Sequence, residues 1–281
     1  MTNVLTPTYR MAKTILAIQR ELQIYTGCAP TYDVQTTLNS KFNRFNSLVP
    51  TTVLPTAKYF CIGINGYTNS NDTNGSLVNE VNKTDMGLYT MIPFRCVPVE
   101  QDLDAPTRLN YRMRVRETLG SAGNTQDYYS YYLKMISYID GAVQLTQTDP
   151  TSKQQIPYTI DYANLSPTVP TPPINGVVSN SQIEVNATVG TSLPISGAEV
   201  VEALTAKYNN LGFRVSEMGI VSGFDQVIQD TDGNGNQINL TEALFAQLNA
   251  HYTWLGADLS NSSATMDLSC LMGSGDCVLL A

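Results

Sequence analysis

The chain has 281 residues, which is enough to bury a core, and only 14% of them are charged, against roughly 25% in an average soluble domain. Its net charge of −8 argues against wrapping of nucleic acid, because phosphate binding needs a surplus of Lys and Arg on the contacting face. Charged residues interrupt the N-terminal apolar positions, and no run of about 18 apolar residues occurs. We therefore expect neither a signal peptide nor membrane insertion.

The first predicted region, 1–57, combines a helix with an extended connector. From Thr8 to Ile24 apolar residues recur at spacings of three and four, the pattern of an amphipathic helix docked by one face: Met11, Ile15, Ile18 and Leu22. From Thr26 to Ala57 three prolines lie among Thr, Asn and Ser. That composition predicts an extended connector.

The second predicted region, 58–140, is an antiparallel β region. Lys58–Asn65 is rich in aromatic and β-branched residues and ends at an Asn-Gly turn, which predicts a strand. Leu88–Val99 contains two prolines that cannot donate to a ladder, so it is expected to form an edge strand or a bulge. Asp127–Asp140 is expected to add a tyrosine-rich strand to the same sheet.

The remaining chain divides into an arm, 141–176, and a compact region, 177–281. The arm is rich in Pro and Thr and favours extended backbone. The compact region is expected to hold two helices, one opened by the Ser196–Glu199 capping box and running to Tyr208, the other from Thr241 to Trp254. The strands expected beside them are Val177–Val189, Arg214–Ser222, Thr265–Leu271 and Cys277–Leu280.

The predicted fold class is α+β. It consists mainly of antiparallel sheet, with an N-terminal helix, two helices in the C-terminal half and long extended arms.

The five cysteines are an odd number and form no Cys-x-x-Cys pair. They indicate neither a closed disulfide framework nor a zinc ribbon. Buried free thiols are the favoured interpretation, and an intermolecular disulfide stays open. The cysteines are Cys28, Cys61, Cys96, Cys270 and Cys277.

A row of arginines is the most informative local pattern. Tyr111–Arg116 alternates strictly, so a regular strand places Arg112, Arg114 and Arg116 on one face. Like charges in a row need neutralising carboxylates. Two sources are open: nearby acidic residues of the same chain, which leave a solvated polar face, or a neighbouring subunit, which makes the row an interface. The candidate intrachain partners are Glu100, Asp102 and Asp104.

The tyrosine-rich strand has three interpretations. Tyrosine buries a large apolar area and keeps a polar tip, so it suits a sheet core, a protein interface or a carbohydrate-binding surface. The residues concerned are Tyr128, Tyr129, Tyr131 and Tyr132.

One turn resembles part of a calcium loop. Asp230, Asp232 and Asn234 occupy the first, third and fifth positions, with a glycine next to the last of them. The twelfth position, which should supply a bidentate carboxylate, is Thr241, and Glu242 falls one residue late. Turn geometry is therefore the favoured interpretation over a metal site.

The motifs of catalysis and nucleotide binding are missing. The single histidine, His251, lies in the expected Thr241–Trp254 helix, where such a residue more often packs than reacts, and no Gly-x-Ser-x-Gly elbow accompanies it. No glycine-rich phosphate loop follows a strand. We expect a protein that is not an enzyme and needs no cofactor.

Two stretches resemble virion structural proteins of large tailed bacteriophages. The first runs through Asp85–Tyr89, Ile92–Arg95, Asp102–Leu103, Arg108, Tyr111–Arg114 and Tyr131–Lys134. The second, Val215–Ile220 followed by the Asp-Gly turn, is similar to a strand-turn-strand of tail and collar components. They cover well under half of the chain and carry no catalytic signature.

The resemblance implies a structural component of the neck, tail or baseplate, located in a virion that is assembled in the host cytoplasm. Its partners would be other copies of itself and neighbouring virion proteins, without sequence-specific nucleic acid. The alternative function is a carbohydrate-binding or adhesin-like module, for which the tyrosines and the calcium-like turn would form the site.

Overall fold

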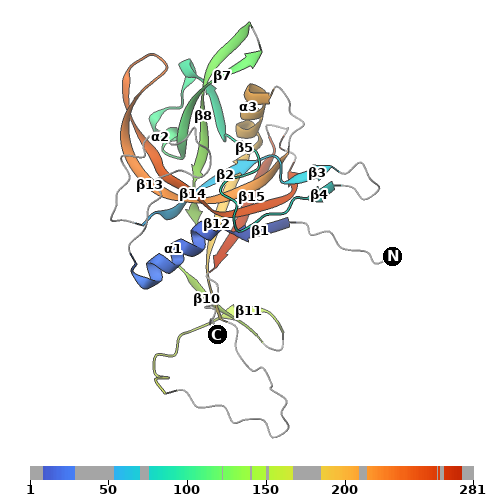
Figure 1. Cartoon of the computed structure of the whole chain (residues 1–281), viewed down its shortest axis with the longest axis vertical. Helices are drawn as coiled ribbons and strands as arrows, with labels where there is room; N and C mark the ends of the chain where they lie inside the picture. Colours follow the sequence, from blue (N-terminus) through green and yellow to red (C-terminus); the bar gives the residue numbers. More distant parts are fainter. Residues whose placement is uncertain are drawn as a thin grey trace. The chain divides into compact units, whose positions relative to one another are not determined.

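The computed structural model describes most of the chain and divides it into two compact units (Figure 1). Unit 1 comprises Met1–Ile136 and Pro194–Asp267, and unit 2 comprises Ser137–Leu193 and Leu268–Ala281. These limits differ from the four predicted regions, because strands from the second and fourth regions pair within unit 1. The described residues are 9–28, 54–69, 76–121, 123–139, 141–149, 152–166, 185–208, 214–257, 259 and 263–273.

Unit 1 is built on an eight-stranded antiparallel sheet. The main strand order is β1-β14-β13-β2-β8-β6, with β5 beside β2 and β7 beside β8. Strands β3 (Tyr67–Asn69) and β4 (Ser76–Val78) form a separate small ladder. The eight strands are β1 (Tyr9–Lys13), β2 (Thr56–Gly63), β5 (Met91–Ile92), β6 (Arg95–Pro98), β7 (Tyr111–Ser121), β8 (Asn124–Met135), β13 (Val215–Thr231) and β14 (Gln237–Ala257).

The described residues of the chain also hold three α-helices, α1 (Ile15–Thr26), α2 (Ala105–Arg108) and α3 (Gly197–Tyr208), and a 3₁₀ turn at Val99–Gln101. None is long and apolar enough to cross a membrane. The prediction of a mainly antiparallel class with some helix is thus confirmed at this coarse level.

The core of unit 1 lies where the sheet brings distant strands together. One cluster joins Tyr59 and Cys61 of β2 with Met113 of β7, Leu133 of β8 and Leu248 of β14. All five are buried. Strands β7 and β14 are not neighbours in the strand order, yet they contact each other. The sheet therefore curls around its own apolar face.

The predicted helix Thr241–Trp254 is wrong, because this segment lies in strand β14. β14 pairs with β13 from Thr231↔Gln237 to Val215↔Ala257, with several register shifts. Residues Leu244–Leu248 are all buried, so both faces of this part of the strand are covered. A strand covered on both faces loses its alternation, and its apolar residues then match helical spacing as well as they match strand spacing.

The N-terminal helix begins later than predicted. Thr14 is the N-cap, and its hydroxyl accepts a hydrogen bond from the Ala17 N–H at 3.4 Å. Gly27, with φ of 67°, ends the helix in the left-handed conformation that glycine favours. The residues before Thr14 form β1, which pairs with β14 from Tyr9↔Trp254 to Lys13↔Ala250. Most of the predicted connector, residues 29–53, lies outside the described residues.

The capping box of the second helix is confirmed. The Glu199 N–H donates to Ser196 Oγ at 3.3 Å, and the Ser196 N–H donates to Glu199 Oε2 at 3.2 Å. The two bonds satisfy donors that a helix start leaves without a partner inside the helix. Helix α3 contacts β6 and β7.

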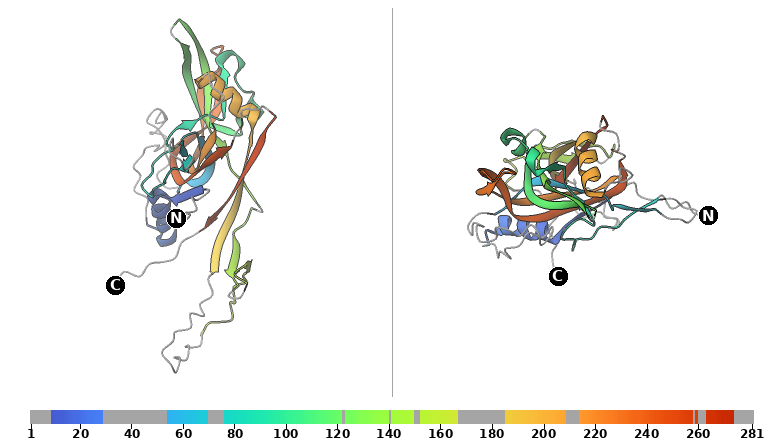
Figure 2. Two further views of the ribbon diagram at one scale, coloured as in Figure 1. Left: turned by 90° about the vertical axis from the view of Figure 1, so that its right-hand side faces the viewer. Right: turned by 90° about the horizontal axis from the view of Figure 1, so that it is seen from above.

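Unit 2 contains parts of a five-stranded sheet of order β11-β10-β12-β15, with β9 beside β12. The paired long strands β12, in yellow, and β15, in red, lie beside each other in Figure 2. Part of the predicted arm 141–176 is therefore paired strand, while 167–176 lies outside the described residues, as do 177–184 and Cys277–Leu280. The strands are β9 (Ser137–Tyr138), β10 (Gln144–Thr148), β11 (Gln155–Pro157), β12 (Val185–Ser196) and β15 (Thr265–Gly273).

Candidate interaction surfaces and buried polar networks

Strand β7 keeps its register with β8, but its backbone is distorted at Met113. Met113 has a φ of 56°, and the β7–β8 register passes it without a shift, from Arg112↔Leu133 to Arg114↔Tyr131. Arg112, Met113 and Arg114 are all buried. The prediction that the arginine row forms a solvated or interface face is therefore wrong for Arg112 and Arg114, because Asp225 and Asp230 of β13 lie against their side chains.

The backbone of β7 at Met113 is tied to β14 by Glu242. The Glu242 carboxylate accepts hydrogen bonds from the backbone N–H groups of Met113, Arg114 and Ala243. Burial raises the pKa of Glu242, although these bonds and the Arg112 charge act in the opposite direction. Glu242 is the carboxylate that falls one position late in the calcium-like loop, and its oxygens are engaged by the β7 backbone.

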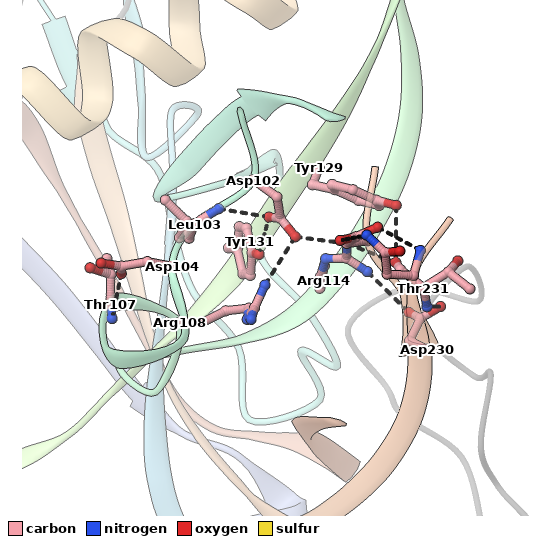
Figure 3. A network of polar contacts seen from close by, with 12 residues as sticks. Asp102, Leu103, Asp104, Thr107, Arg108, Arg114, Tyr129, Tyr131, Asp230 and Thr231 are labelled. Carbon is pink, nitrogen blue, oxygen red and sulfur yellow. Dashed lines mark hydrogen bonds and ion pairs between the residues drawn. The ribbon is translucent and has the colours of Figure 1, made fainter. Parts of the chain in front are cut away.

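Arg114 lies at the centre of a polar network (Figure 3). Its guanidinium contacts Asp102 at 2.8 Å and Asp230 at 3.1 Å. Asp102 also accepts hydrogen bonds from Arg108 at 3.2 Å and from the Tyr131 hydroxyl at 2.5 Å. The Tyr129 ring lies 3.3 Å from the Arg114 guanidinium carbon, within the range of a cation–π contact. Carboxylates of the same chain therefore neutralise Arg114, which is the first of the two possibilities that the sequence left open.

Arg112 is neutralised in the same way by a different carboxylate. Its Nε donates to Asp225 at 2.7 Å, and Asp225 also accepts from the Tyr59 hydroxyl at 2.9 Å. Burial acts to raise the pKa of Asp225, but the hydrogen bond and charge of Arg112 outweigh it and lower the pKa below its ordinary value. Glu100 lies in the 3₁₀ turn, and Asp104 caps α2 by accepting the Thr107 N–H at 2.9 Å.

A cavity of about 300 Å³ adjoins these arginines. Arg108, Arg112 and Arg114 line it together with Glu242 and Tyr131. Each of the three arginines already contacts a carboxylate. The cavity therefore presents balanced charge, and it gives no preference for an anionic ligand.

The predicted interface residues separate into a buried and an accessible group. Arg116 is accessible and pairs with Asp127 at 2.6 Å, and Tyr128 is half-buried. Tyr129, Tyr131 and Tyr132 are buried, and the Tyr132 hydroxyl donates to Glu117. A partner or a sugar ring cannot stack on these buried rings, so the predicted tyrosine surface is wrong for these three residues.

The calcium-like turn connects β13 to β14. Asp230 contacts Arg114, while Asp232 Oδ1 accepts the N–H groups of Asn234 at 2.9 Å and Asn236 at 2.8 Å. The Asp232 carboxylate therefore closes the turn, as turn geometry requires. Asn234 contributes its backbone N–H to the same turn. In the part of the chain that the structure describes, no group of three or more His, Cys, Asp and Glu could hold a metal ion.

His251 belongs to a second buried network, on β14 and not on a helix. Its Nδ1 lies 2.8 Å from Asp85, its Nε2 lies 3.3 Å from Glu217, and the Tyr89 ring centre is 5.2 Å away. Glu217 also accepts the N–H of Asn65 at 2.6 Å. Both ring nitrogens face carboxylates, and His251 and Glu217 are fully buried. The sequence offered one signal for this network: Glu217 is the single charged residue in the stretch Val215–Phe224.

Helix α1 packs against the sheet with its polar side. Arg20 and Gln23 are buried, and Arg20 Nη2 donates to Gln247 Oε1 at 2.9 Å. The Arg20 guanidinium also lies 5.5 Å from the centre of the Phe245 ring. Of the predicted apolar stripe, Ile15 and Leu22 are exposed on the side away from β14, Ile18 is half-buried, and Met11 lies in β1 before the helix. The expectation of a helix docked by that stripe is therefore wrong in orientation.

The outward side of this N-terminal segment is apolar. Leu22 is 57% exposed and Tyr25 82%, and Tyr9 of β1 is 68% exposed. Ile15 and Met11 are exposed as well. Lys13 pairs with Glu21 along the same segment. We call this set, Tyr9, Met11, Ile15, Leu22 and Tyr25, the N-terminal apolar surface.

Comparison with known proteins identifies a family for the chain. Residues 1–281 match a family of unknown function, DUF7208, and the chain belongs to this family. No curated protein and no solved structure matches the chain.

Proposed function

We propose that this member of the DUF7208 family is a structural subunit of a tailed-phage virion, part of the neck, tail or baseplate, and is not an enzyme. It acts by packing against copies of itself and against neighbouring virion proteins in a particle assembled in the host cytoplasm. The observation that carries the assembly role is the orientation of α1, which turns its apolar stripe away from its own sheet. The resemblance of two stretches to phage virion proteins carries the phage assignment.

The orientation of α1 has a physical cost that a partner removes. Apolar surface in water is unfavourable by about 25 cal/mol per Å² relative to burial. A helix that only had to cover β14 would bury Leu22 and expose Arg20, whereas α1 does the reverse. Ile15, Leu22 and Tyr25 lie on one side of α1 by helical spacing, and exposed apolar residues gathered on one side of a folded protein mark a site of association. The N-terminal apolar surface is thus the best supported contact site on unit 1.

The strand before α1 offers a second kind of contact at the same place. β1 is the last strand in the order of the unit 1 sheet, and no strand of the described residues pairs with its outer side. The edge of a sheet presents backbone N–H and C=O groups that can pair with a strand of another chain. A neighbour could therefore use backbone pairing to β1 and apolar contact to α1 together.

The buried networks support a mechanical role and not a catalytic one. Arg112, Arg114, Glu217 and His251 are each held by several partners inside the core. Such networks fix the relative positions of strands. The alternative carbohydrate-binding function receives no support from the tyrosine strand, whose rings at Tyr129, Tyr131 and Tyr132 are buried.

The Leu22→Glu variant tests this proposal. We expect the purified variant to unfold at the same temperature as the parent chain, because Leu22 is exposed. When the variant replaces the parent chain during infection, we expect it to be excluded from particles. Gln101→Glu adds the same charge at an exposed position of the 3₁₀ turn, outside α1 and β1, and should enter particles normally. The measurement is quantitative mass spectrometry of purified particles. Absence of the parent chain from particles, or equal incorporation of both variants, would refute the proposal.

A further inference from the structure

The outer part of the β7–β8 hairpin lacks a third strand. β8 pairs with β7 as far as the hairpin turn, but β6 ends at Pro98, which lies opposite Tyr128. After Pro98 the chain enters the 3₁₀ turn Val99–Gln101, and no strand of the described residues continues the line of β6. Figure 1 shows this outer part of the hairpin, in green, projecting from the sheet. We call the segment Asn124–Asp127 of β8 the open edge.

The register shows which backbone groups the open edge presents. The Phe94 N–H, on the side of β6, donates to the Tyr131 carbonyl at 2.8 Å. Backbone groups of successive residues in a strand point to alternate sides. The groups of Tyr129, Asp127 and Thr125 therefore point to the same side as those of Tyr131. β6 pairs with Tyr129, but among the described residues no strand pairs with Asp127 or Thr125 from this side.

The open edge also lacks the usual protection of a strand edge. Native proteins commonly shield such an edge with lysine, proline or charges that would be buried by a further strand. Asn124, Thr125 and Gln126 are uncharged and exposed. The carboxylate of the fourth residue, Asp127, is paired with Arg116 of β7. The open edge can therefore accept a further strand.

A groove of about 770 Å³ lies beside the open edge. Leu119 pairs directly with Gln126, and Pro98 with Tyr128, so these four lining side chains share one face of the sheet. The second half of α3, from Glu202 to Tyr208, forms the wall. We call this space the hairpin groove. A strand added in line with β6 would direct every second side chain into it.

The chemistry of the hairpin groove favours an uncharged segment. Of the described residues that line it, only Glu202 and Lys207 are charged. Glu202 already pairs with Arg95 at 2.7 Å, and Lys207 with Glu117 at 3.0 Å. A charged side chain that entered the groove would therefore lose water without gaining a new counter-charge. Apolar and aromatic side chains complete the lining, among them Leu119, Tyr128 and Tyr208.

We propose that the open edge binds an extended, uncharged peptide segment of a partner protein as an added strand, with alternate apolar side chains in the hairpin groove. In strand addition, backbone hydrogen bonds supply affinity and pockets for alternate side chains supply specificity. A sugar could use the tyrosine rings, but it would leave the aligned backbone groups of Thr125 and Asp127 unused. This surface is separate from the N-terminal apolar surface, and the inference goes beyond the proposed function because it requires no particular particle.

An array of octapeptides of random sequence tests the inference with the labelled full chain. We expect the bound octapeptides to be uncharged and apolar at alternate positions. Thr125→Ala keeps the backbone N–H and should bind the tightest octapeptide as the parent chain does. Thr125→Pro removes an N–H that β7 does not use, so the hairpin should stay intact while the dissociation constant rises at least about tenfold. Equal affinity of the two variants would overturn the inference.

N-methylation of the octapeptide tests the same bonds without changing the protein. Methyl groups on the backbone amides should weaken binding to the parent chain at least about tenfold, because they remove the donors that a strand needs. Unchanged binding of the methylated octapeptide would contradict strand addition. Binding of the parent chain to a glycan array, without binding to any octapeptide, would show that the groove recognises carbohydrate and would refute the inference.

Residue-resolved hydrogen exchange shows whether the open edge is accessible in the isolated full chain. The amides of Thr125 and Asp127 should exchange faster than that of Gln126, which points to β7, and the bound octapeptide should slow both. Slow exchange of Thr125 and Asp127 in the isolated chain would mean that another segment of the same chain occupies the edge, and the inference would fail. A chain that binds octapeptides but is absent from particles would refute the proposed function alone.

Discussion

At the residue scale, carboxylates of the same chain pair with the buried arginines Arg112 and Arg114. Asp102 contacts Arg108, Arg114 and Tyr131 within a network where both Arg114 and Asp102 are nearly inaccessible to solvent. The sequence showed that the arginines need neutralisation and named Asp102 among the possible partners. It could not show that Arg112 and Arg114 are buried, because Asp225 and Asp230, which lie against them, belong to a strand far away in the chain.

Removing the charge of Asp102 tests the role of this network. In Asp102→Asn the side chain keeps its size, but Arg114 loses one of its two carboxylates and Arg108 loses its contact. Breaking a buried ion pair typically costs about 3 kcal/mol, and we expect a loss of that size in the free energy of unfolding, measured by urea denaturation. Asp127→Asn, in the exposed pair with Arg116, should leave the denaturation midpoint nearly unchanged. Equal effects of the two substitutions would contradict this assignment.

Glu199, in the first turn of helix α3, is another carboxylate with several hydrogen-bond partners. It accepts hydrogen bonds from the Tyr111 hydroxyl, from Lys134 at 3.2 Å and from the Ser196 N–H at 3.2 Å. Burial acts to raise the pKa of Glu199, but these partners outweigh it and hold the pKa below its ordinary value of 4.5. A carboxyl group with a lowered pKa stabilises the folded state above its ordinary pKa, and this stabilisation is lost as the pH falls through the pKa of the folded state.

We therefore expect the free energy of unfolding to fall as the pH is lowered below 4.5, the ordinary pKa of Glu199. Glu199→Gln should be less stable than the parent chain at pH 7, and its stability should depend less on pH in the acid range. Urea denaturation across this pH range measures both. Parallel pH profiles for the parent chain and the variant would show that Glu199 does not contribute to the acid sensitivity.

At the element scale, the sequence predicted those elements that carry a local signal. The capping box at Ser196 fixed the start of α3, and the aromatic and β-branched residues after Lys58 predicted β2 within two residues at each end. The predictions failed where distant strands decide the structure. The segment of β14 was predicted as a helix because the spacing of its apolar residues fits both structures. The apolar residues of α1 were predicted to face the core because the sequence does not show which side of a helix contacts the sheet.

At the scale of the whole molecule, both units have apolar surface that their described residues leave uncovered. In unit 1 this is the N-terminal apolar surface on β1 and α1, and in unit 2 it includes Val185 of β12, which is 40% exposed. The low charged fraction of 14% fits a chain that uses part of its surface for neighbours. The sequence predicted association, but it placed the contact on the arginine and tyrosine strands, whose side chains are largely buried.

Oxidative footprinting of intact phage particles is the most direct test of the central claim, that this chain is a virion subunit with α1 turned toward a neighbour. Tyr25 and Met11 are exposed in the isolated chain, and hydroxyl radicals should oxidise both there. The account predicts that the chain is present in the particles and that both residues are strongly protected from oxidation, while the exposed Leu165 of unit 2 provides an internal reference. Particles that lack the chain, or that contain it with Tyr25 and Met11 oxidised as readily as in the isolated protein, would contradict the account.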